Sequence, residues 1–185
     1  MNLNATPTTQ NELLLNNLLH YYKDSNNMER MLSIINGESE TSLRVIDWFV
    51  TNYSKTHYTI YCLSNRRRFK VYSDYKLKLK SYSKRRFDPF CRWDRIMIPY
   101  ENDTNIQTTI GQLNFFKWAF ENEIIEYIEK YKDEIESDMN TRNGTAKRKQ
   151  AGVETNKTRK KREELSVSAS KVIRKDEVEV TVSFG

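Results

Sequence analysis

The strongest constraint on the fold is an apolar stripe of helical period that begins just after Thr109. Steps of three or four residues place all its members on one side of a helix. Thr109 and Gln112 have the spacing of a capping box at the start of this segment. The pattern predicts one long amphipathic helix with an acidic outer face. The stripe consists of Leu113, Phe116, Phe120, Ile124, Tyr127, Tyr131 and Ile135.

Weaker patterns predict the elements that this helix packs against. One or two helices are expected over 12–35, broken near 24–27 and ended by Gly37, and a helix capped by Thr41 or Ser42 is expected over 43–53. Residue types that favour strands predict a hairpin. Over 75–83 helical and strand periodicities compete, and we favour the helix. The predicted strands are 58–63, 69–72 and 95–100, with a turn at 87–90.

Composition divides the chain into four parts. The fold class that we predict is α+β: one small domain in which a short sheet packs on the long helix, followed by a basic arm and a terminal strand. Alternation at 165–169 and 178–184 predicts this last strand, which can pair within the chain or with a partner. The parts are a disordered N-terminus (1–11), an α+β core (12–140), a basic linker or arm (141–162) and a C-terminal β segment (163–185).

Between Arg66 and Arg95 the chain is strongly basic and rich in aromatic residues. This basic window holds twelve Lys/Arg and three Asp, a net charge of +9, against +6 for all 185 residues. Cations neutralise phosphates and aromatic faces stack on bases, so the mixture is typical of a nucleic-acid surface. We expect Tyr82 or Trp93 to stack. The candidate phosphate contacts here are Arg66, Arg67, Arg68, Lys70, Lys76, Lys78, Lys80, Lys84, Arg85, Arg86 and Arg92.

Two other interpretations of the basic window stay open. It can be a solvated face whose aromatic residues lie mainly in the core. It can also bind acidic groups, either on a partner protein or on the chain's own acidic helix over 121–138. Exposed ion pairs contribute only about 0–1 kcal/mol each, so such docking also needs packing.

A second basic segment follows the long helix. It can serve as a disordered phosphate-binding tail, as a bipartite nuclear-import signal, or simply as a solubilising linker. Its candidate contacts are Lys147, Arg148, Lys149, Arg159, Lys160, Lys161 and Arg162.

Motifs for catalysis, metal binding and membrane insertion are not found. The His and Cys residues lack the spacing of a zinc site. The sequence also lacks a glycine-rich phosphate loop and a nucleophile elbow, and no apolar run is long enough for a membrane span. We therefore predict a non-enzymatic protein without a metal, a cofactor or a membrane partner. The His and Cys residues of the chain are His20, His57, Cys62 and Cys91.

Five segments of the sequence resemble a protein found across nucleocytoplasmic large DNA viruses of the mimivirus and phycodnavirus kind. The resemblance implies a role of the late-transcription-factor class, although poxvirus-type members of that class carry a cysteine-rich zinc finger and this chain has two cysteines. It supplies no catalytic residues. The segments are Ser42–Ser54, Tyr75–Lys84, Phe87–Arg92, Gly111–Trp118 and Lys161–Lys171.

Together these observations predict a viral nucleic-acid-binding protein that acts in late transcription or genome packaging. DNA is favoured over RNA, and viral transcription or virion proteins are expected as further partners. We expect it in the virus factory of the host cytoplasm, in the nucleus or in the virion. The alternative is a virion structural or assembly protein that binds acidic protein partners.

Overall fold

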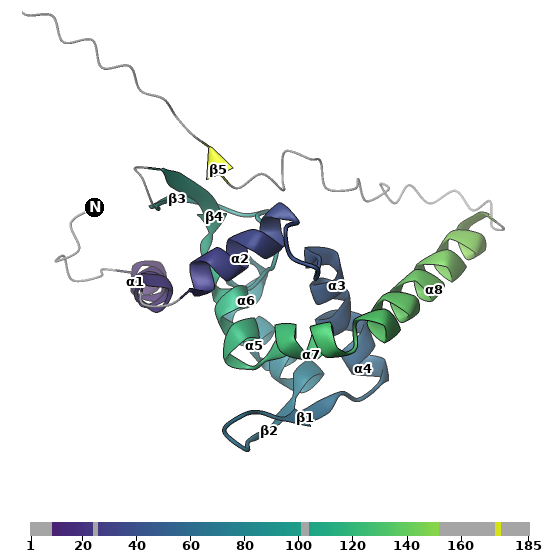
Figure 1. The fold of residues 1–185 in the computed structure, drawn as a ribbon. Helices are drawn as coiled ribbons and strands as arrows, with labels where there is room; N and C mark the ends of the chain where they lie inside the picture. Colours follow the sequence, from purple (N-terminus) through teal and green to yellow (C-terminus); the bar gives the residue numbers. More distant parts are fainter. Residues whose placement is uncertain (1–8, 24–25, 101–103, 152–172, 175–185) are drawn as a thin grey trace, which may run out of the picture.

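The structure is a computed structural model that describes residues 9–23, 26–100, 104–151 and 173–174. Over these residues the chain forms a single α+β domain, mainly helical, with two small antiparallel sheets (Figure 1). The elements are α1 (Gln10–Lys23), α2 (Asn27–Asn36), α3 (Leu43–Trp48), the π-helix η1 (Phe49–Tyr53), α4 (Ser54–Thr56), β1 (Ile60–Cys62), β2 (Arg68–Lys70), α5 (Val71–Arg86), β3 (Arg95–Pro99), β4 (Asn105–Thr109), α6 (Ile110–Glu121), α7 (Ile124–Lys130), α8 (Lys132–Ala151) and β5 (Ile173–Arg174).

The first helix begins earlier than its apolar pattern predicts. Thr9 and Glu12 form a capping box, in which each backbone N–H donates to the other side chain at 3.2 Å. This arrangement satisfies two N–H groups that a helix start leaves without partners. Residues 10 and 11, predicted as disordered, therefore belong to α1. The rest of that predicted segment, residues 1–8, lies outside the described residues.

The next helices end and begin where the sequence predicts. Gly37 takes the left-handed conformation (φ 77°) after α2 and confirms the predicted cap. The Ser42 hydroxyl accepts a hydrogen bond from the Val45 amide at 3.3 Å, so Ser42 rather than Thr41 caps α3. The helix then passes through the π turn of η1, whose Phe49 is fully buried, and continues into α4.

Two antiparallel hairpins lie at opposite ends of the helical body in Figure 1. The predicted first hairpin is confirmed: β1 pairs with β2, in the register Ile60↔Lys70, Tyr61↔Phe69 and Cys62↔Arg68. Its strands are shorter than predicted, because residues 71 and 72 already belong to α5. The predicted strand over 95–100 is also confirmed as β3. Its partner β4 was not predicted. Because the two hairpins form separate sheets, the single short sheet of the prediction is corrected to two.

The short strand β5 extends the second sheet from the C-terminal part of the chain. Ile173 pairs with Ile106, and Arg174 pairs with Asn105, both antiparallel. This strand therefore pairs within the chain. The alternating segments 165–169 and 178–184, from which a terminal strand was predicted, lie outside the described residues.

The single long helix predicted from the apolar stripe is wrong: the segment forms α6, α7 and the start of α8. Glu123 adopts a left-handed conformation (φ 54°) between the first two, and Tyr131 has a non-helical backbone (φ −119°, ψ 27°) between the last two. The Thr109 hydroxyl accepts from the Gln112 amide at 3.0 Å, as predicted for the cap. Most of the stripe still faces the core, although Tyr131 is 37% exposed. Its fully buried members are Leu113, Phe116, Ile124 and Ile135.

Helix α6 is the centre of the core. The rings of Phe87, Phe115 and Trp118 lie 5.3–5.6 Å apart, centroid to centroid. Tyr22 of α1 donates its hydroxyl proton to the Leu113 carbonyl at 2.7 Å, which ties α1 to α6. Aromatic groups at these separations gain energy beyond the area that they bury.

Helix α8 continues to Ala151, eleven residues into the segment that was predicted as a linker. Its first half is anchored to the body, because Asp138 accepts a hydrogen bond from Trp48 Nε1 at 2.9 Å and Glu134 accepts one from the Tyr53 hydroxyl. Its second half projects away from the helical body in Figure 1. The remainder of the predicted arm, residues 152–162, lies outside the described residues.

Candidate nucleic-acid interface

The β1–β2 hairpin presents the first group of basic side chains. Its tip is a tight turn in which Arg66 has φ 64°, its amide donates to the Leu63 carbonyl at 2.8 Å, and the Leu63 amide donates to the Arg67 carbonyl at 2.9 Å. Cross-strand partners share a face, so Ile60, Cys62, Arg68 and Lys70 form the outer face of the hairpin, and all four are exposed.

The break between α6 and α7 holds this hairpin in place. Tyr61 donates to the Asn122 carbonyl at 2.6 Å, and Arg67 Nη2 donates to Asn122 Oδ1 at 2.9 Å. The Ser64 amide donates to Glu123 Oε1 at 2.8 Å, and hydrogen bonds from Ser64 lower the pKa of the Glu123 carboxyl. Arg67 therefore fastens the hairpin, whereas Arg66 and Arg68 extend from it.

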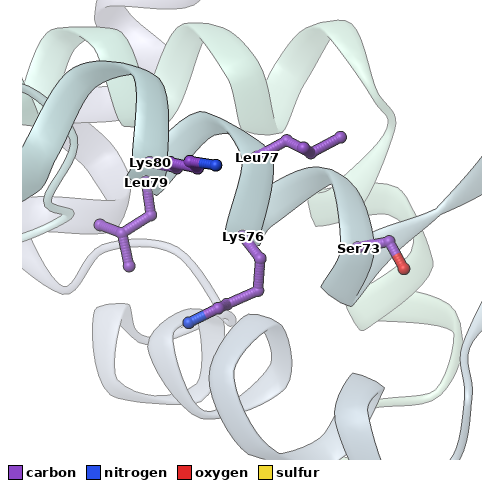
Figure 2. Close-up of a pocket in the computed structure, with 5 residues that line it drawn as sticks. All are labelled: Ser73, Lys76, Leu77, Leu79 and Lys80. Carbon is purple, nitrogen blue, oxygen red and sulfur yellow. The ribbon is translucent and has the colours of Figure 1, made fainter.

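Helix α5 presents the second group. Tyr75, Leu79 and Tyr82 are half-buried against the core, which confirms the helical alternative for 75–83. Lys76 and Lys80, one turn apart, are exposed beside Leu77, whose exposed fraction is 64%. Figure 2 shows Leu77 and Lys80 on one side of α5 and Leu79 on the other.

These α5 side chains, with Ser73, line a shallow hollow (Figure 2). All five lining residues come from one helix, so the hollow is a surface depression and offers no enclosing walls. Lys78, another predicted contact, is half-buried and does not line it.

The end of α5 presents the third group. Ser83 (φ 61°, ψ 168°) kinks the helix, and Lys84 and Arg85 beyond it are exposed. Arg86 is half-buried, and its carbonyl accepts from Asn114 Nδ2 at 2.8 Å. The kink therefore separates these cations from the lysines on the straight part of α5.

Two predicted contacts are bound instead to the buried carboxylate of Asp88. Arg92 Nε and Nη2 donate to Asp88 Oδ2 and Oδ1 at 2.9 and 2.8 Å, and Trp93 Nε1 donates to Oδ2 at 3.1 Å. The same hydrogen bonds raise the pKa of Arg92 further. Because a buried carboxylate needs such donors, Arg92 and Trp93 hold the turn after α5.

Tyr82 and Trp93 were predicted to stack on bases, but neither has a fully exposed ring face. Tyr82 stacks on the buried Phe87 ring at 6.2 Å. Trp93 is 37% exposed, but the Arg85 guanidinium already lies 5.9 Å from its ring centre. Phe87 and Phe90 are buried and half-buried, in line with the prediction that the aromatic residues of the window lie largely in the core.

The exposed cations of the window are not neutralised by the described part of the chain. Among the described residues, no carboxylate forms an ion pair with the basic side chains of the hairpin or α5. The acidic helix segment pairs elsewhere: Glu126 with Arg30 at 2.7 Å, and Asp138 with Arg142 at 2.8 Å. Within the described ranges no ion pair joins the window to the acidic segment, and the two meet instead through the hydrogen bond from Arg67 to the Asn122 side chain.

The predicted arm is only partly described. Lys147, Arg148 and Lys149 fall on the projecting half of α8 rather than in a linker. The remaining predicted contacts of the arm lie outside the described residues: Arg159, Lys160, Lys161 and Arg162.

Tyr58, predicted to start a strand, is the most exposed large hydrophobic residue in the described part of the chain. Tyr58 has φ 48° and an exposed fraction of 81%. It follows the end of α4, where the Thr59 amide donates to the Ser54 carbonyl at 3.2 Å. This bond defines a Schellman motif, in which glycine usually takes the left-handed position. No sequence pattern indicates a tyrosine there.

Among the described residues, no three or more His, Cys, Asp or Glu side chains gather as a metal-binding cluster. No described helix is both long enough and apolar enough to cross a bilayer. Burial raises the pKa of the Cys91 thiol.

By fold and surface, the chain is a small, mainly helical α+β domain with an exposed basic hairpin and helix. It belongs to a family of unknown function (DUF7197), whose model matches residues 2–183. The chain is 48% identical over 117 residues to "Uncharacterized protein L507" of Acanthamoeba polyphaga mimivirus. That match covers 59% of this chain and 45% of the relative, so the chain spans less than half the relative's length.

The mimivirus relative supports a giant-virus origin, in agreement with the resemblance noted in the sequence. No solved structure matches the chain.

Proposed function

We propose that this chain is a non-catalytic nucleic-acid-binding protein of a giant virus, acting in late transcription or genome packaging. The observation that carries the proposal is the exposed basic surface on the β1–β2 hairpin and α5. Its cations, including Arg66, Arg68, Lys76 and Lys80, have no carboxylate partner among the described residues. Such a surface releases counterions when it meets a phosphate backbone.

The site of action follows from this role. A protein that binds the viral genome or its transcripts acts where they are made or packaged, in the virus factory, the nucleus or the virion. The viral relative supports a viral setting.

The proposal is tested by binding measured against salt. Fluorescence anisotropy with duplex DNA, single-stranded DNA and RNA is recorded from about 50 to 200 mM salt. We compare the wild type with the triple variant Arg66→Ala, Arg68→Ala, Lys70→Ala. Arg67 is kept because it is bound to Asn122. Each phosphate contact contributes about 0.7–0.9 to the slope of log K against log salt, so the variant should flatten it by about 2–3.

A second triple variant controls for net charge. Lys23→Ala, Arg44→Ala, Lys130→Ala removes the same three charges from exposed positions on α1, α3 and α7. It should keep a slope close to the wild type. If the two variants flattened the slope equally, binding would depend on the net charge of the protein and not on the hairpin. No binding at 50 mM salt would favour the virion assembly protein with acidic protein partners instead.

A further inference from the structure

Tyr58 combines backbone strain with an unused side chain. A non-glycine residue in the left-handed region costs roughly 1–2 kcal/mol. Tyr58 is 81% exposed, and no described residue forms a hydrogen bond or ring contact with its side chain. Neither local preference nor packing therefore accounts for an aromatic residue at this position. Strained residues of this kind gather at functional sites.

The neighbours of Tyr58 are apolar and basic. The next residue, Thr59, accepts from the Val71 amide at 3.3 Å, so Tyr58 lies at the end of the β1–β2 ladder. From there the outer face of the hairpin continues through the Ile60–Lys70 pair to the Cys62–Arg68 pair, with Arg66 at the tip. Ile60 is 41% exposed. The hairpin thus has the exposed Tyr58 at the base of its ladder, apolar surface and two cations on its outer face, and Arg66 at its tip.

This chemistry fits a nucleic acid with unpaired bases better than a duplex. In a duplex the base faces are covered by their neighbours, and an exposed ring can reach them only at the ends. In a single strand the base faces are accessible, and aromatic side chains beside a basic track bind them without regard to sequence. An acidic peptide would use the cations and leave the ring without a role.

We infer that the outer face of the β1–β2 hairpin binds single-stranded nucleic acid, with a base stacked on Tyr58 and phosphates on Arg66, Arg68 and Lys70. The inference rests on the proposed function and adds to it the strand form and the stacking residue. It replaces Tyr82 and Trp93 in the stacking role.

The test uses the full chain and fluorescein-labelled strands of about 20 nucleotides, longer than the usual single-strand site. The probes are oligothymidine, oligouridine and a duplex of equal length. Tyr58→Ala should weaken binding of the single strands by about 5- to 150-fold. It should leave their salt slope and duplex affinity unchanged, because it removes no charge. Tyr58→Phe should bind as the wild type does.

Leu13→Ala serves as the matched control, since it removes another exposed apolar side chain (52%) from α1, away from the hairpin. It should bind as the wild type does. Wild-type affinity of Tyr58→Ala for both single strands, or a wild-type preference for the duplex, would overturn the inference. In either case a flattened slope for the hairpin triple variant would leave the proposed function standing. A wild type that binds none of the probes would remove both.

Discussion

A left-handed residue after a helix is normally glycine, because a Cβ in that conformation crowds the following carbonyl oxygen. Tyr58 holds this position with φ 48° and an almost fully exposed ring. We expect Tyr58→Gly to raise the free energy of unfolding by about 0.5–1 kcal/mol, since relief of strain outweighs the added freedom of the unfolded chain. Urea unfolding followed by circular dichroism measures the change.

Tyr58→Ala separates the two contributions to this result. It removes the ring and keeps the Cβ, so its stability should lie within about 0.5 kcal/mol of the wild type. If Tyr58→Gly were instead less stable than the wild type by more than 1 kcal/mol, the ring would have a packing role. If Tyr58→Gly is more stable than the wild type and binds single strands less well, the strained tyrosine serves binding rather than stability.

Single residues also show why a count of charges in the sequence overestimates the number of cations that can contact a ligand. The basic window was visible in the sequence, and Arg66, Arg68 and Lys76 are indeed exposed. Arg67, however, is bound to Asn122, 55 positions away in the chain. Such a partner has no local signature, so sequence patterns cannot separate a cation that fastens the fold from one that faces a ligand.

Among the elements, the apolar stripe after Thr109 predicted which side chains face the core but not the course of the backbone. Periodicity records side-chain direction, and the steps of three and four stay compatible with a helix that breaks and resumes. The left-handed residue is Glu123, which has no obvious turn signal. Its side chain accepts from the Ser64 amide, so the break serves the hairpin through tertiary contacts.

The contact between α5 and α6 depends on Gly111. A Cβ at this position would lie 2.8 Å from the Arg85 carbonyl oxygen and 3.3 Å from the Phe87 amide nitrogen. Both are backbone atoms, which cannot move aside as a flexible side chain can. We expect Gly111→Ala to lower the free energy of unfolding by about 1–3 kcal/mol, the usual effect of overpacking. Urea denaturation at constant pH measures it.

Ser81→Ala is the control for this contact. Ser81 is exposed on α5, so the change should alter stability by no more than about 0.5 kcal/mol. If Gly111→Ala were as stable as the wild type, α5 and α6 could move apart without any loss of stability. Their close approach would then not fix the basic end of α5.

For the whole molecule, the sequence sufficed for the α+β class, the first hairpin, the α5 helix and the burial of five of the seven stripe residues. It did not indicate β4, because Asn105–Thr109 is short and polar, and three of its five residues are buried only through tertiary contacts. Nor did it show that the window is divided among a hairpin, a helix face and a kinked end. These placements depend on packing between distant segments, which local propensity does not record.

The folded molecule also buries many phenol groups. Burial raises the pKa of Tyr21 and Tyr75 to about 12. Burial likewise raises the pKa of Tyr22, Tyr53 and Tyr61. Tyr53 also donates a hydrogen bond to Glu134, which raises its pKa further. In the unfolded chain these groups ionise near pH 10. The folded state therefore keeps protons that the unfolded state has already released at alkaline pH.

Stability should then be complete below pH 10 and be lost as the pH rises toward 12. Each buried tyrosine contributes at most about 1.4 kcal/mol per pH unit to this slope. Urea unfolding at about pH 8, 9.5 and 11 tests the expectation, and recovery of signal at pH 8 shows that the loss is reversible. Tyr75→Phe keeps the ring and removes the proton, so its slope should be shallower. Equal stability at pH 8 and 11 would mean that these phenols ionise as readily in the folded state.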